Sequence, residues 1–193
     1  MHYNPRQTSE ADLRIIAGSW RGRTLAAPAG ATTRPTAERM RQALFDMLMH
    51  APWAEGCIEG ANVLDAFAGT GALGLEALSR GAATAYFIET ERHALAALRA
   101  NVAACKAADC ATVIAGDALR PKPGVPCGLV FLDPPYAQDL VPNAIGALAR
   151  AGWIAPGALV IAETGRDEAL VLPAELCAER VHGAARITAW RVA

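Results

Sequence analysis

Four consecutive residues carry the clearest chemical signal in the chain. Asp133, Pro134, Pro135 and Tyr136 follow an apolar run at 129–132. Two successive prolines fix φ and remove both backbone donors, so this loop presents carbonyl oxygens without competing N–H groups. The Asp133 carboxylate and the Pro134 carbonyl are then two acceptors, and Tyr136 offers a flat ring for stacking. This tetrapeptide predicts a site for the exocyclic amine of a planar heterocycle.

Methyl transfer to such an amine requires a site that holds its N–H groups in a fixed geometry. The nitrogen lone pair of an aromatic amine is delocalised into its ring, and holding both N–H bonds out of plane partly localises it. We therefore expect acceleration from positioning and exclusion of water rather than from a strong base. Asp133 or water then takes the released proton, and a base inside a helix must be unstacked to reach the site. The structural alternative is a proline-rich turn with a capping aspartate.

A glycine turn after the first expected strand, 62–66, predicts a small-ligand site. Glycines let a ligand approach the backbone closely, and the first-turn N–H groups of the following helix lack partners within it. The residues expected to bind a cofactor here are Asp65, Ala66, Phe67, Ala68, Gly69, Thr70 and Gly71.

Two ligand classes use this design. Gly69, Gly71 and Gly74 satisfy G-x-G-x-x-G with Glu89 about twenty residues on, which is the dinucleotide pattern. The Asp65 carboxylate beside the turn disfavours a pyrophosphate and suits the ammonium of S-adenosylmethionine (SAM), with Glu89 accepting from the ribose hydroxyls. The alternative is that Asp65 only caps the turn and Glu89 is a solvated strand end.

Four further residues complete the expected cofactor site, and one of them is Asp133, which the amine site shares. Asp117, after the third strand, is a candidate acceptor for the adenine amino group, and Ala118 is a candidate N–H donor. Thr90 follows the acid that ends the second strand. An ordinary Gly-Asp turn is the alternative at Asp117.

Strands and helices alternate along most of the chain. This order predicts an α/β fold with a mostly parallel seven-stranded sheet and helices on both faces. Open sheets of this kind bind ligands at the carboxyl ends of their strands, where the acids stand. The expected strands are 62–66, 84–89, 111–115, 129–132, 158–162, 176–182 and 186–192, the last two antiparallel, and the expected helices are 71–80, 91–105 and 139–151.

The N-terminal part of the chain is basic. Residues 1–42 carry a net charge of +4 and the remainder carries −5. A hairpin is expected at 13–25, with bends at Gly18 and Gly22, and such a basic segment suggests a surface for a polyanion. The candidate contacts are Arg14, Trp20, Arg21, Arg23, Arg34 and Arg39. A solvated hairpin with Trp20 in the core is the alternative.

A helix is expected from an N-cap at Thr36 to about His50. Pro35 stiffens its entry and so fixes Arg34 in place. These elements predict two parts, an arginine-rich extension at 1–50 and a ligand-binding domain at 51–193.

Composition excludes several classes of protein. With 193 residues, 53% hydrophobic and 19% charged, the chain is globular, and it contains no apolar run of membrane-spanning length. The N-terminus lacks a signal peptide, and five cysteines without a C-x-x-C indicate neither disulfides nor zinc. A cytoplasmic protein without a metal is expected, and His93 and His182 are interpreted as structural.

Four stretches stand out together: DAFAGTGALGLEALSRGA, FLDPPY, RIIAGSWRGRTL and TRPTAERMRQALF. Together they resemble the bacterial RsmD family of 16S rRNA guanine-N2 methyltransferases, named for guanine 966, over about residues 13–165. The resemblance implies a class I, Rossmann-like SAM-dependent methyltransferase with an N-terminal hairpin and helix extension. It further implies that the arginine-rich segment contacts 16S rRNA in the small ribosomal subunit or its assembly intermediate. Separately from the resemblance, we expect a monomer. His182-Gly183 stands where the family has Tyr-Gly.

Three rival functions stay open. A DNA adenine-N6 methyltransferase shares the glycine turn and the loop at 133–136 but normally brings a sequence-reading domain. A non-catalytic rRNA-binding assembly factor has no need of that loop. A nicotinamide oxidoreductase fits only the glycine pattern.

Overall fold

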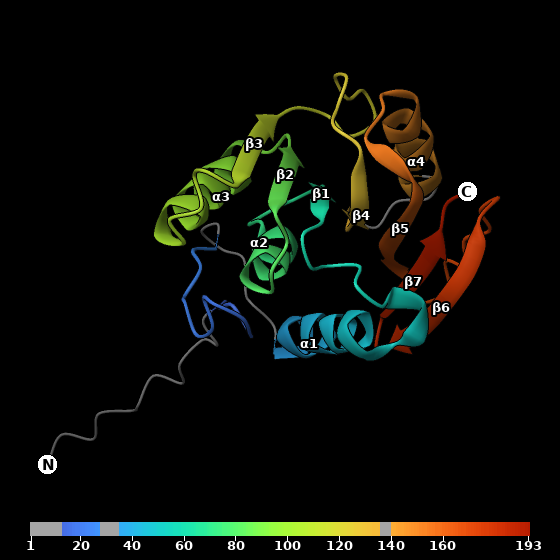
Figure 1. Cartoon of the computed structure of the whole chain (residues 1–193), viewed down its shortest axis with the longest axis horizontal. Coiled ribbons are helices and arrows are strands. Elements are labelled where there is room, and N and C mark those ends of the chain that lie inside the picture. Colours follow the sequence, from blue (N-terminus) through green and yellow to red (C-terminus); the bar gives the residue numbers. More distant parts are fainter. Residues whose placement is uncertain (1–12, 28–34, 136–139) are drawn as a thin grey trace, which may run out of the picture.

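One sheet organises the computed structural model, which describes residues 13–27, 35–135 and 140–193. Its seven strands have the order β3-β2-β1-β4-β5-β7-β6 (Figure 1). β1 to β5 run parallel, and β7 lies antiparallel between β5 and β6. The strands are β1 Asn62–Ala66, β2 Thr84–Glu89, β3 Ala111–Ala115, β4 Cys127–Leu132, β5 Ile154–Gly165, β6 Glu175–His182 and β7 Ala185–Arg191. The helices are α1 Pro35–His50, the short η1 Pro52–Ala54, α2 Ala72–Ser79, α3 Arg92–Ala104 and α4 Leu140–Arg150.

The sheet has a separate apolar core on each face. Successive strand residues point to opposite faces, so Phe131 belongs to the core that includes residues of α1, α2 and α3, whereas its neighbour Val130 belongs to the core that includes residues of α4. The expected mostly parallel sheet with helices on both faces is therefore confirmed.

The expected bounds of β5 and α1 are wrong, and β4 begins at Cys127, two residues before the expected start at 129. β5 begins at Ile154, not at 158, and continues to Gly165, because Ile154 pairs with Cys127 of β4 ahead of a register irregularity, within which Gly157 has φ of +75°. α1 begins at Pro35, so Thr36 lies within the first turn rather than at the N-cap. Proline suits a first helical position because its φ is already helical and its missing N–H has no partner there.

The N-terminal hairpin, residues 13–25, closes through an antiparallel bridge between Arg14 and Thr24. Gly18 and Gly22 both have φ of +80°, which confirms the two predicted bends. Ile15 and Leu25 are buried in the same core as α1 and α2, so the hairpin is packed onto the body of the protein. No helix in the described part of the chain has both the length and the apolar character to cross a membrane.

Candidate active site

Three carboxyl groups meet at the edge where the parallel strands end. Asp65 lies on β1, Glu89 ends β2, and Asp133 follows β4. Asp65 is only 1% exposed, and its burial, together with the charges of Asp133 and Glu89, raises its pKa to about 8. Because these groups disfavour one another's negative charge, the edge favours a positively charged ligand over a pyrophosphate.

The glycine turn is tied to Asp65 by one backbone contact. The Gly74 N–H donates to Asp65 Oδ2 at an N···O distance of 2.9 Å, so Asp65 does cap this turn, as the structural alternative proposed. A Cβ on Gly74 would lie 2.4 Å from the Phe87 ring, which explains why only glycine fits there. Phe67 and Gly69 have φ of +69° and +54° in the same turn.

Glu89 orders the loop rather than lying free in solvent. Its Oε2 accepts from the Gly69 N–H at 2.7 Å, and its Oε1 accepts from the Thr90 and Glu91 N–H groups, each at 2.7 Å. A carboxylate offers roughly four acceptor positions, so one position on Oε2 is left for a ligand hydroxyl. The reading of Glu89 as a solvated strand end is therefore wrong.

The segment after β3 forms a compact turn at the same edge. Asp117 Oδ1 accepts from the Leu119 N–H at 2.8 Å, which is the turn geometry that the alternative described. Ala118 is buried in the core on the α4 face. Thr90 is exposed beside the Glu89 loop.

Asp133, Pro134 and Pro135 follow β4 directly, and Tyr136 lies outside the described residues. Crowding by protein atoms and the neighbouring Glu163 carboxylate raise the pKa of Asp133 to about 7. The Asp133 side chain still reaches solvent, because the crowding atoms line an open cavity.

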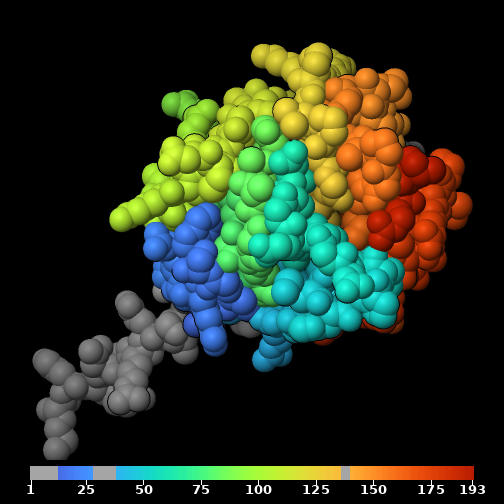
Figure 2. Space-filling model, viewed as in Figure 1, coloured from blue at the N-terminus to red at the C-terminus, as the bar shows by residue number. Residues whose placement is uncertain are grey.

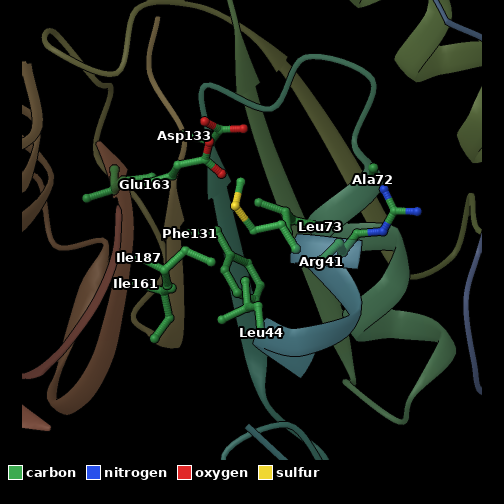
Figure 3. Close-up of a pocket in the computed structure, with 11 residues that line it drawn as sticks. Arg41, Leu44, Ala72, Leu73, Phe131, Asp133, Ile161, Glu163 and Ile187 are labelled. Carbon is green, nitrogen blue, oxygen red and sulfur yellow. The ribbon is translucent and has the colours of Figure 1, made fainter. Parts of the chain in front are cut away.

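This cavity lies between the sheet and two helices (Figure 3). Its cavity volume is about 160 Å³, which is below the usual range for drug-sized ligands. Its lining residues are Met40, Arg41 and Leu44 of α1, Ala72 and Leu73 of α2, and Phe131, Leu132, Asp133, Ile161, Glu163 and Ile187 of the sheet. Arg41 is 7% exposed, and its Nε has no hydrogen-bond partner among the described residues.

The candidate RNA contacts lie along one side of the molecule. Figure 2 shows the N-terminal hairpin (blue) and α1 (light blue to cyan) on that side. Arg21 and Arg39 are exposed, whereas Trp20 is half-buried against the core, as its structural alternative predicted. Arg14 pairs with Glu38 at 3.0 Å, and Arg23 donates to the Ala104 carbonyl. Arg34 lies outside the described residues.

Glu76 of α2, which the sequence did not single out, holds the hairpin in place. It is 0% exposed and accepts from the Ile16 N–H at 2.7 Å, the Ala17 N–H at 3.0 Å and Arg80 Nε at 2.7 Å. A charged residue among the apolar residues of the expected helix was the available signal. The hairpin is thereby fixed to the helix that carries the glycine turn.

A second unpredicted residue, Asn101 of α3, links the hairpin to the glycine turn. Its side chain bonds both backbone groups of Ala26 and also donates to the Thr70 carbonyl at 2.9 Å. It is almost fully buried. The sequence offered no signal for it, since an asparagine in a helix is ordinarily surface-exposed.

The residues present fit SAM. The buried Asp65 and its two acidic neighbours favour a cation, and the turn beside them places backbone next to open space, since a Cβ on Gly69 would meet nothing within 4 Å. A sheet of this strand order, with a glycine turn after its first strand, defines the Rossmann-like fold of SAM-dependent methyltransferases.

Comparison with known proteins identifies the family. The model described as conserved hypothetical protein 95 matches residues 13–191. Over 168 residues, covering 86% of this chain and 81% of the relative, the chain is 40% identical to ribosomal RNA small subunit methyltransferase D of Escherichia coli. The protein of the same name from Haemophilus influenzae is 37% identical over 170 residues, covering 86% and 85%. The chain belongs to this family, which confirms the RsmD resemblance.

Solved structures agree with this assignment. The putative methyltransferase yhhF from Escherichia coli has a TM-score of 0.81 at 38% identity and covers 94% of this chain and 98% of its own. Magnesium protoporphyrin IX methyltransferase from Synechocystis, solved with bound SAM, has a TM-score of 0.63 at 15% identity and covers 82% and 80%. The latter likeness shows the fold alone.

Proposed function

We propose that this protein transfers a methyl group from SAM to the exocyclic N2 of a guanine in 16S rRNA of the small ribosomal subunit. SAM-dependent methylation of rRNA follows from the family, whose members are named for it. The guanine-N2 target is the finer part of the proposal. The observation that carries it is the placement of Asp133, which the two prolines follow directly, at a cavity beside the cation-favouring carboxyl edge.

Each group at this edge has a distinct role. Bound SAM supplies an electrophilic methyl group on a positively charged sulfur. Asp65 and Glu89 order the glycine turn that receives it, and Glu89 keeps one acceptor position for a ribose hydroxyl. Asp117 and Ala118 contact the adenine ring in this proposal, with Thr90 at the margin of the site.

At the substrate side, Asp133 and the Pro134 carbonyl accept hydrogen bonds from the two N–H groups of the target amine, and Tyr136 stacks on its ring. Asp133 has a pKa near 7, so it is partly ionised at neutral pH and can accept the proton that the amine loses. The apolar walls of the cavity, including Phe131 and Leu44, exclude water from the reacting atoms. Most of the acceleration comes from this positioning.

The basic extension, residues 1–50, contacts the RNA and the remainder, 51–193, performs the transfer, with one copy sufficient for both. Arg21 and Arg39 are exposed on the side formed by the hairpin and α1, which adjoins the cavity through Met40 and Arg41. Phosphate contacts there hold the RNA while the base enters the cavity.

Methyl transfer from labelled SAM tests the proposal. The purified protein is incubated with 16S rRNA, with small subunits lacking the modification, and with duplex DNA, and the product nucleosides are identified by mass spectrometry. We expect N2-methylguanosine in the RNA and none in DNA; label in DNA adenine alone would overturn the proposal. The Asp133→Ala variant is expected to retain SAM binding and lose transfer, whereas full activity in that variant would favour a role in assembly without catalysis.

A further inference from the structure

Glu163 lies in the cavity beside Asp133, although neither the motifs nor the proposed mechanism uses it. β4 and β5 are neighbours with Leu132 opposite Ala162, so the next residues, Asp133 and Glu163, lie side by side. Figure 3 shows both carboxyl groups at the same end of the cavity. The charge of Glu163 contributes to the raised pKa of Asp133, which indicates that the two groups are close.

The apolar and charged residues that line the cavity suit a planar ligand with polar edges. Phe131, Ile161 and Ile187 form its apolar floor on one face of the sheet. The buried Arg41, whose Nε has no hydrogen-bond partner within the described part of the chain, belongs to its opposite wall. The two carboxyl groups at one end would repel each other unless hydrogen-bond donors lie between them or a proton is shared. A ligand edge with adjacent N–H donors satisfies this requirement.

Guanine has such an edge and adenine does not. Next to the N2 amine of guanine lies N1–H, a second donor, whereas the ring nitrogen beside the adenine amine is an acceptor. We propose that Glu163 accepts a hydrogen bond from the guanine N1–H group while Asp133 holds the N2 amine. Glu163 thereby selects guanine as the base to be methylated. This inference rests on the proposed function and assigns its base specificity to a residue of β5.

The arrangement also explains how one loop motif serves different bases. Asp133 and Pro134 recognise only an exocyclic amine, which guanine, adenine and cytosine all carry. Discrimination must then come from a group that reads the neighbouring ring position. Glu163 lies one strand away from Asp133 and close enough for its charge to raise the Asp133 pKa, so both carboxyl groups can face one base edge.

A base analogue tests the proposal directly. An RNA hairpin with 2-aminopurine at the target position keeps the 2-amino group but has an acceptor at N1. We expect the wild-type protein to favour guanine over 2-aminopurine in kcat/KM on the order of 10- to 100-fold, from loss of one specific base contact. Glu163→Gln can donate to the analogue, so its preference is expected to fall to within a fewfold of unity.

Controls separate the possible outcomes. Glu168→Gln removes the same charge just beyond β5, outside the cavity, and is expected to keep the wild-type preference. SAM affinity and thermal melting of Glu163→Gln show whether it folds; Glu163→Asp, which keeps the charge, is expected to keep the guanine preference at a lower kcat/KM. Equal use of guanine and 2-aminopurine by the wild type, or an unchanged preference in folded Glu163→Gln, would overturn the role of Glu163. Absence of any guanine methylation by the wild type would instead overturn the proposed function.

Discussion

Replacing Glu76 by alanine is expected to detach the N-terminal hairpin and to destabilise the protein strongly. The carboxylate is fully buried and receives hydrogen bonds from the Ile16 and Ala17 N–H groups and from Arg80. The Arg80 side chain is itself only 8% exposed. Arg41 also depends on this carboxylate, because burial lowers its pKa and the charge of Glu76 opposes that effect.

The expected loss of unfolding free energy follows from the groups that lose their partner when Glu76 is replaced by alanine. Breaking a buried ion pair by removing one partner costs about 3–5 kcal/mol, since the other charge stays buried. Each orphaned backbone N–H adds about 1–3 kcal/mol unless it reaches water. The hairpin can expose both amides by lifting away, so we expect the total loss of unfolding free energy to stay at about 3–5 kcal/mol. That is a large part of the roughly 5–15 kcal/mol typical of a folded domain.

Urea unfolding followed by circular dichroism measures this loss, and native-state hydrogen exchange measures detachment. In Glu76→Ala, the Ile16 and Ala17 amides are expected to exchange much faster than those of β1. Glu175→Ala, an exposed carboxylate on β6, is the matched control and is expected to change stability by less than about 0.5 kcal/mol. A loss below about 1 kcal/mol with both hairpin amides still protected would refute the anchoring role.

The other predictions concern the cofactor and substrate sites. Gly74→Ala places a methyl group against the β2 aromatic ring and is expected to cost about 1–3 kcal/mol in urea unfolding and to weaken SAM binding by calorimetry. The raised pKa of Asp65 means that the folded state binds a proton that the unfolded state has released, so ligand-free stability falls from about pH 4 toward pH 8. Asp65→Asn should flatten this fall in melting scans, and parallel curves for variant and wild type would contradict it. Methyl transfer by the wild type should rise with pH and level off above about 7, as Asp133 ionises, and Asp133→Asn should lose this dependence along with most of its rate. Arg39→Ala should weaken RNA binding in filter assays without changing SAM affinity, and equal loss of both would argue against a phosphate contact.

Much of the fold could be predicted from the sequence because its elements have strong local patterns. The strand predicted at 84–89 coincides with β2 to the residue, since an apolar run bounded by turn residues leaves little choice of limits. β5 was predicted too short because its first residues join the sheet only through the pairing of Ile154 with Cys127, and Pro156 and Gly157 carry no strand signal of their own.

Some residues of the candidate site could be predicted from the sequence and others could not. Asp65, Glu89 and Asp133 were predicted because each follows an apolar run, and the carboxyl ends of parallel strands share one edge. Glu163 also follows such a run and was missed, since no glycine or proline motif marks it. Glu76 could not be assigned a partner, because Ile16 lies sixty residues away along the chain.

Asn101 and Glu76, which were not predicted from the sequence, connect the N-terminal hairpin to the glycine turn. Asn101 bonds Ala26, just after the hairpin, and Thr70, in the glycine turn. Glu76 ties the hairpin to the helix that begins at that turn. Moving the hairpin therefore leaves buried polar groups without partners in both places, at about 1–3 kcal/mol for each. Because that cost opposes independent motion, the basic hairpin and the glycine turn form one rigid unit. Under the proposed function, an RNA bound to the hairpin is therefore held in a fixed position relative to the methyl donor.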